Sequence, residues 1–171
     1  MITSQFRVFL LFGTSLLPAF AAEHGTLQAG AAKVDITPSA EAALPMSGFA
    51  GRKEGFKGIH DHIYVRAIVF SDGTRLAAIV AWELIGVPNP VWEELSQRIA
   101  RETNVLPEYL LLAAVHDHSA PAPFGMYGNS SPKSAAYTKQ VEDATVQAIR
   151  QRCRMPRTRG RQGVLAVAKR R

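Results

Sequence analysis

Apolar residues recur along this chain with two different spacings, which predict strands and helices in alternation. Residues 62–70 carry an apolar side chain at every second position, which predicts a strand with one buried face. Residues 76–82 and 109–115 are almost wholly apolar, so they are predicted as strands buried on both faces. Residues 91–103 repeat apolar positions at helical spacing and predict an amphipathic helix.

Turn and loop residues separate these segments. A strand is predicted over 28–36, where it stops before a proline, and a loop rich in glycine and proline follows over 39–58. Ser71-Asp72-Gly73 is typical of a hairpin turn. A polar loop over 116–132 precedes a second predicted helix over 133–150. Strands that alternate with helices in this order predict an α/β fold class, with layered strands and helices.

The first 22 residues have the three regions of a secretory signal peptide. A polar start that ends at Arg7 precedes an apolar run over 8–17, and the segment closes on small residues. The apolar run is too short to span a bilayer, so we expect cleavage after Ala21 or Ala22 and a secreted or periplasmic location. The body of the protein then spans 23–149. A retained membrane anchor is the alternative.

Charge is distributed unevenly along the chain. The formal net charge of the 171 residues is +6, yet residues 150–171 hold nine Lys or Arg and no acidic residue. The other residues are therefore mildly acidic on balance and give no reason to predict a nucleic-acid binder. The single cysteine, Cys153, excludes an intramolecular disulfide and a paired-cysteine metal knuckle.

The basic tail over 150–171 breaks the helical pattern abruptly, and three interpretations are open. We favour a shifted reading frame, because an arginine-rich sequence without periodicity is what a GC-rich gene gives when translated off frame. The second interpretation is a genuine tail that binds anionic lipid headgroups or nucleic acid by charge. The third is an ordinary solvated terminus.

Four of the five histidines fall in two His-Asp-His pairs. His116 and His118 follow a predicted buried strand, at the carboxyl end where α/β folds place their sites. Residues two apart in an extended chain point to one side, so we expect both imidazoles to face one point and Asp117 to point away. Imidazole is a ligand for zinc and other transition metals. The alternatives are two solvated loop histidines or a histidine that caps a turn.

The second pair, His60 and His62, is the weaker candidate. It lies between a glycine-rich loop and a predicted strand, where one packed and one exposed histidine would explain it without any ligand. The shared His-Asp-His sequence leaves a two-metal centre open. Glu83, at the end of an apolar strand, is either a carboxylate that orients a metal ligand or an exposed strand-end residue.

Five segments stand in an order and spacing that carry a resemblance. They are Ala29 to Pro38, Met46-Ser47-Gly48-Phe49, Gly58-Ile59-His60-Asp61, Tyr64-Val65-Arg66-Ala67, and Leu111 to Pro121. Together they resemble the start of the catalytic domain of the neutral/alkaline ceramidases, and the resemblance covers residues 28–150.

The resemblance implies a secreted or surface-bound zinc amidase that cleaves the amide bond of a lipid, ceramide, to give sphingosine and a fatty acid. By its match to the family's histidine motif, His116 is the implied zinc ligand and His118 an implied catalytic residue of the active site. His60 matches the histidine of a Gly-Ile-His segment and is a further candidate metal ligand. Zinc would polarise the amide carbonyl and lower the pKa of a bound water.

The chain departs from the family pattern in three respects. Asp117 stands where threonine is usual, and Ala120 stands where glycine is common. Family enzymes are also much longer, and their other zinc ligands and a serine implicated in the reaction lie far downstream. Because a catalytic zinc generally needs three protein ligands, we expect a partial, truncated domain with little or no amidase activity. The alternative is a secreted, non-catalytic module that binds lipid or a membrane surface.

Overall fold

The structure, a computed structural model, describes residues 27–48, 52, 54–126, 129–153 and 165–167. Every strand and helix that the apolar pattern predicts is present in them with nearly the predicted bounds. The elements in chain order are β1 (Gln28–Asp35), η1 (Ala40–Ala42), β2 (Tyr64–Ser71), β3 (Leu76–Trp82), α1 (Asn89–Thr103), η2 (Pro107–Tyr109), β4 (Leu110–Ala114), α2 (Pro132–Cys153) and β5 (Leu165–Val167), where η marks a 3-10 helix.

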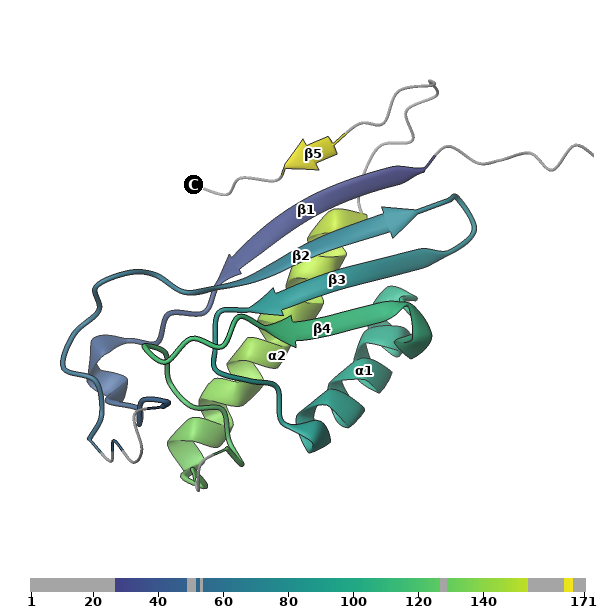
Figure 1. Cartoon of the computed structure of the whole chain (residues 1–171). Helices are drawn as coiled ribbons and strands as arrows, with labels where there is room; N and C mark the ends of the chain where they lie inside the picture. Colours follow the sequence, from purple (N-terminus) through teal and green to yellow (C-terminus); the bar gives the residue numbers. More distant parts are fainter. Residues whose placement is uncertain (1–26, 49–51, 53, 127–128, 154–164, 168–171) are drawn as a thin grey trace, which may run out of the picture.

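The strands form one mixed sheet in the order β4-β3-β2-β1-β5. β2 is antiparallel to both of its neighbours, β1 and β3, and a tight hairpin joins it to β3. β4 is parallel to β3 because α1 carries the chain back along the sheet between them. β5 pairs in parallel with β1. This layered arrangement of one sheet and two α-helices confirms the predicted α/β fold class (Figure 1).

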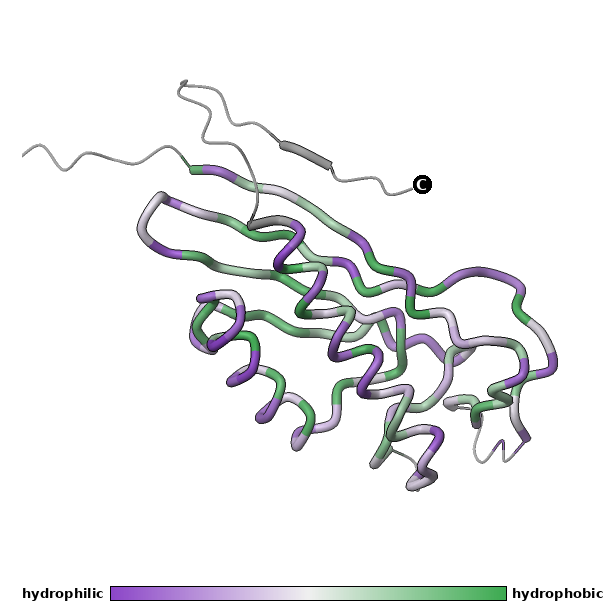
Figure 2. Tube along the Cα trace, turned by 180° about the vertical axis from the view of Figure 1, so that it is seen from behind, coloured by the Kyte–Doolittle hydropathy of each residue, from purple (hydrophilic) through white to green (hydrophobic). Residues whose placement is uncertain are grey.

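Both α-helices lie against the same face of the sheet, and α2 crosses β1 and β2 (Figure 1 and Figure 2). The face of β2 that the sequence predicts to be buried does point into the core, since Val65, Ala67 and Val69 are at most 4% exposed. These side chains share one apolar cluster with residues of β3 and of both helices. The partners include Val80, Trp82, Leu95, Ile99, Val141 and Ile149.

The opposite face of the sheet corrects one prediction. β3 and β4 are predicted to be buried on both faces, but Ile79 is 45% exposed and Leu111 is 57% exposed. Both stand in register with Ile68 of β2, so a row of large aliphatic side chains crosses the face that the helices leave open. A continuous apolar run shows that both sides of a strand suit a core, but the arrangement of the helices decides which side is covered.

Two predictions fall wholly or partly outside the described residues. The predicted signal peptide over 1–22 lies outside them. In the basic tail, α2 continues beyond residue 150 to Cys153, and β5 follows at Leu165–Val167. Among the described residues, no helix is long and apolar enough to cross a membrane.

The hairpin between β2 and β3 turns where the sequence predicts. Asp72 Oδ1 accepts hydrogen bonds from the backbone N–H groups of Arg75 and Thr74 and from the Thr74 hydroxyl. These bonds lower the pKa of Asp72 to about 2. Gly73 has a φ of +93°, a left-handed conformation that glycine adopts without strain, and no atom lies within 4 Å of where a Cβ would stand.

Trp82 joins the sheet to α2 through a buried hydrogen bond. Its indole Nε1 donates to Thr145 Oγ1 at 2.8 Å, and the Thr145 hydroxyl donates to the carbonyl of Val141 at 2.9 Å. Both Trp82 and Thr145 are 0% exposed, so neither group has access to bulk water. The bond therefore fixes how α2 is rotated about its own axis relative to Trp82, the largest fully buried side chain.

The substitution Thr145→Val removes this acceptor at nearly constant side-chain shape. We expect it to lower the free energy of unfolding by about 1–3 kcal/mol, because the buried indole N–H loses its partner. Urea unfolding followed by circular dichroism measures the loss. In a Trp82→Phe background the same substitution should cost much less, and an equal cost in both backgrounds would contradict the role of the bond.

Candidate active site

The candidate site lies where the chain leaves the carboxyl ends of the parallel strands β3 and β4. Backbone pairing continues past the strands, since Val115 N–H donates to the Trp82 carbonyl at 3.0 Å and Asp117 N–H to the Leu84 carbonyl at 3.1 Å. His116, between the two donors, has a φ of 66°. This left-handed conformation is uncommon for a residue other than glycine, and such strain is concentrated at functional sites.

The imidazoles of His116 and His118 face each other. Their Nε2 atoms are 3.2 Å apart and their ring centroids 4.9 Å apart. Because His116 is in the left-handed region, the alternation of an extended chain is not what brings the rings together. His116 Nδ1 lies 2.9 Å from the carbonyl oxygen of Ile85. A carbonyl only accepts, so Nδ1 carries the proton and the Nε2 of neutral His116 presents a lone pair.

This histidine pair fits one edge of a metal site. Two imidazole nitrogens on a tetrahedral zinc ion lie about 3.4 Å apart, and the Nε2 atoms are 3.2 Å apart. A carbonyl that accepts from the other ring nitrogen is also a usual partner of a metal-binding histidine. Among the described residues, however, no group of three or more His, Cys, Asp or Glu side chains is placed to hold a metal. The histidine pair offers two nitrogen donors, fewer than the three protein ligands that a catalytic zinc generally has.

A short segment from the loop before β2 packs against the histidine loop. Met46 forms an antiparallel bridge with Pro121. Ser47 donates to the Ala120 carbonyl twice, from its N–H at 2.9 Å and from its hydroxyl at 2.8 Å. Arg52 Nη2 donates to the His118 carbonyl at 2.9 Å. Sequence reasoning missed these contacts because the partners are 73 and 66 residues apart.

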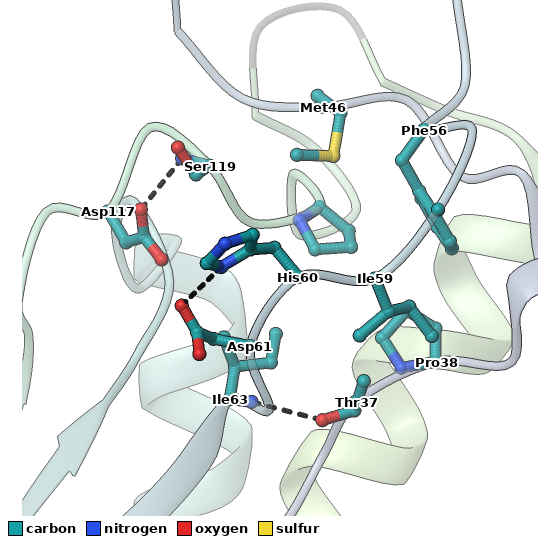
Figure 3. Close-up of a pocket in the computed structure, with 12 residues that line it drawn as sticks. Thr37, Pro38, Met46, Phe56, Ile59, His60, Asp61, Ile63, Asp117 and Ser119 are labelled. Atoms are coloured by element: carbon teal, nitrogen blue, oxygen red, sulfur yellow. Dashed lines mark hydrogen bonds and ion pairs between the residues drawn. The ribbon is translucent and has the colours of Figure 1, made fainter.

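Asp117 and Ser119 alternate with His116 and His118 along the chain. They line a cavity of about 520 Å³, which His116 and His118 do not line (Figure 3). The Ser119 N–H donates to Asp117 Oδ1 at 2.7 Å, which closes a tight turn in the loop. The cavity has an apolar part and a polar part. It is lined by Pro38, Met46, Phe56, Gly58, Ile59, Ile63 and Pro121, and by the polar residues Thr37, His60, Asp61, Asp117 and Ser119.

His60 lies at this cavity and not beside the histidine pair. Its Nδ1 is 2.7 Å from Asp61 Oδ2, and its side chain is 97% exposed. Figure 3 shows the ring between Asp61 and the loop that carries Asp117 and Ser119. Among the described residues, His60 does not join His116 and His118 in a group that could hold a metal.

His62 belongs to a separate cluster that ties the end of β1 to the start of β2. Its Nδ1 is 2.8 Å from Asp35 Oδ2 and 3.2 Å from the Thr37 hydroxyl. Thr37 also donates its N–H to Asp35 and accepts the N–H of Ile63. Partial burial acts to raise the pKa of Asp35, but the hydrogen bonds from Thr37 and the charge of His62 outweigh it and lower this pKa.

Glu83 also has a structural role. Its carboxylate accepts the backbone N–H of Tyr64 at 2.8 Å and a hydrogen bond from Arg66 Nε. Its side chain is only 20% exposed. Glu83 therefore links β2 to the end of β3. Its partners here are Tyr64 and Arg66 and not a histidine, and its side chain is not exposed at the strand end, so both roles suggested by the sequence are corrected.

The two facing histidines follow β4, at the sheet edge where the parallel strands β3 and β4 end and where α/β folds place their sites. The family model for neutral/alkaline non-lysosomal ceramidase, N-terminal, matches residues 27–171. The chain belongs to this family. The match includes the basic tail over 150–171.

Solved structures resemble this chain, and two of them are ceramidases. One is the neutral ceramidase from Pseudomonas aeruginosa, at 25% sequence identity and a TM-score of 0.62. The other is a ceramidase complexed with C2, at 27% identity and a TM-score of 0.62. Each comparison covers 74% of this chain and 21% of the other, so this chain spans about a fifth of the length of these relatives. No curated protein sequence matches the chain.

The lowered pKa of Asp35 predicts acid-dependent stability. Because the folded pKa lies below the ordinary value of 3.8, the carboxylate stabilises the fold fully above that pH and loses its effect as the pH falls through the folded value. Asp35→Asn should therefore lower the free energy of unfolding at pH 7, with a smaller difference in acid. Urea unfolding at both pH values measures this. Asp61→Asn is the exposed control, and an Asp35→Asn difference independent of pH would contradict the assignment.

Proposed function

We propose that this chain is the N-terminal part of the catalytic domain of a zinc-dependent amidohydrolase that cleaves the N-acyl amide of a ceramide-like lipid. The observation that carries the proposal is the facing pair of Nε2 atoms on His116 and His118, 3.2 Å apart, in a chain of the ceramidase family. The solved relatives are ceramidases, which supports the reaction and the substrate class.

In this proposal the zinc ion is held by Nε2 of His116. The Ile85 carbonyl keeps the ring in the required tautomer by accepting the Nδ1 proton. His118 is assigned to the active site as a catalytic residue, and its Nε2, which faces the same point, would also contact the metal. When bound, zinc would polarise the amide carbonyl and lower the pKa of a water molecule. His60 is proposed as a ligand of a separate metal ion at the cavity, together with donors beyond the described residues.

The cavity beside the histidine loop offers surfaces for both parts of an amphiphile. Met46, Phe56 and Ile59 line it with apolar surface that suits an aliphatic chain. Thr37 and Asp117 line it with groups that hydrogen-bond hydroxyls. An apolar wall with a few polar groups supports a lipid substrate with a hydroxylated head.

The location and the extent of the active protein are part of the proposal. Export through the predicted signal peptide would deliver the protein to a secreted or periplasmic location, where it meets lipid at a membrane surface. The chain spans 21% of the length of each solved relative, and the described residues supply two metal donors. We therefore propose that hydrolysis needs residues beyond the described ones.

Zinc titration of the full chain by calorimetry tests the metal site. We expect binding at the histidine pair, and a loss of at least about tenfold in affinity for His116→Ala and for His118→Ala, because each removes an Nε2 donor. The matched control is His62→Ala, which removes an imidazole engaged by Asp35 and should leave zinc affinity unchanged. His60→Ala should leave zinc affinity at the histidine pair unchanged, because His60 lies at the cavity and not beside the pair. Zinc affinity that survives His116→Ala intact would overturn the assignment.

An activity assay tests the extent of the catalytic set. With zinc present, we expect the purified chain to release little or no fatty acid from a short-chain N-acyl sphingosine, because two imidazoles leave the metal site incomplete. Release of the product is measured by mass spectrometry. Turnover that disappears in His116→Ala would show instead that the chain carries a complete active site.

A further inference from the structure

We propose that Gly48 is a positioning residue for the active site: the absence of a side chain at this position lets the His118 ring lie against the backbone and directs it toward His116. A Cβ on Gly48 would stand 2.3 Å from Nδ1, 2.6 Å from Cγ and 3.0 Å from Cε1 of His118. Real Cβ atoms essentially never approach other atoms this closely, so the ring and a side chain at residue 48 exclude each other.

The backbone at Gly48 has little freedom to retreat from the ring. Gly48 has a φ of +74°, which already requires glycine or a strained residue. The preceding residue, Ser47, is 1% exposed and donates twice to the carbonyl of Ala120. On the other side of this bridge, Ala122 N–H donates to the Pro45 carbonyl at 3.0 Å. The register of the two segments therefore fixes the distance from Gly48 to the histidine loop.

The ring is the group that would move instead. The backbone of His118 is held through its carbonyl by Arg52, so relief of a contact at residue 48 comes from rotation of the imidazole. Such a rotation changes the position of Nε2, which stands 3.2 Å from Nε2 of His116. An alanine at residue 48 would thus disturb the histidine pair without removing either donor.

A positive φ alone does not explain this requirement, and the chain contains a matched control. Gly73 has a φ of +93°, but no atom lies within 4 Å of its Cβ position. Gly73→Ala therefore introduces backbone strain without a contact, whereas Gly48→Ala introduces both. The difference between the two variants isolates the contact with His118.

The experiment compares the two variants in the full chain, with three measurements on each. NMR of the histidine side chains in metal-free protein should show shifted His118 ring signals in Gly48→Ala and unchanged ones in Gly73→Ala. Calorimetry should show zinc affinity reduced about 10–100-fold in Gly48→Ala and unchanged in Gly73→Ala. Urea unfolding should show a larger loss of stability in Gly48→Ala, and this excess should vanish in a His118→Ala background, where the ring is absent.

The outcomes separate this inference from the proposed function on which its zinc measurement rests. Shifted His118 signals in a protein that binds no zinc would support the positioning role and contradict the proposed function. Unchanged ring signals and unchanged zinc affinity in Gly48→Ala would overturn the positioning role. If Gly48→Ala does not fold, recovery of folding in Gly48→Ala/His118→Ala supports the contact as the cause, and failure to recover overturns it.

Discussion

The parallel pairing of β3 and β4 is the constraint on which the candidate site depends. Two parallel strands end at the same edge of a sheet, and their hydrogen bonding continues here past both ends, at Val115 and at Asp117. This continued pairing places the Ile85 carbonyl where it accepts the Nδ1 proton of His116. The orientation of the imidazole thus follows from the register of the sheet, and a slip of one residue would turn it to the other side.

Local patterns in the sequence were sufficient for most of the fold. The alternation over 62–70 predicts which side of β2 is buried, and Ser71-Asp72-Gly73 predicts the hairpin that follows. In the site, the spacing of His116 and His118 predicts two imidazoles that face one point, and the Nε2 distance agrees with it. The cause is different, because the turn at His116 is left-handed and not extended.

The features that could not be predicted depend on residues far apart in the sequence. The contact of Gly48 with His118 depends on the bridge between their loops, and the tautomer of His116 depends on Ile85 in the segment after β3. The exposure of Ile79 and Leu111 has the same origin. Apolar composition marks a strand as suited to burial, but the connections between elements decide which face α1 and α2 cover.

Contacts within the protein hold the histidine pair in place. In many small metal-binding domains the metal itself supplies the free energy of folding, because the ligands are not assembled without it. In this chain, sheet hydrogen bonds fix the backbone of His116, the Ile85 carbonyl fixes its ring, and the Gly48 backbone limits the ring of His118. Because protein contacts order the two imidazoles, further donors would only have to complete the coordination number of the proposed metal site, and its affinity would depend on contacts that ligate nothing themselves.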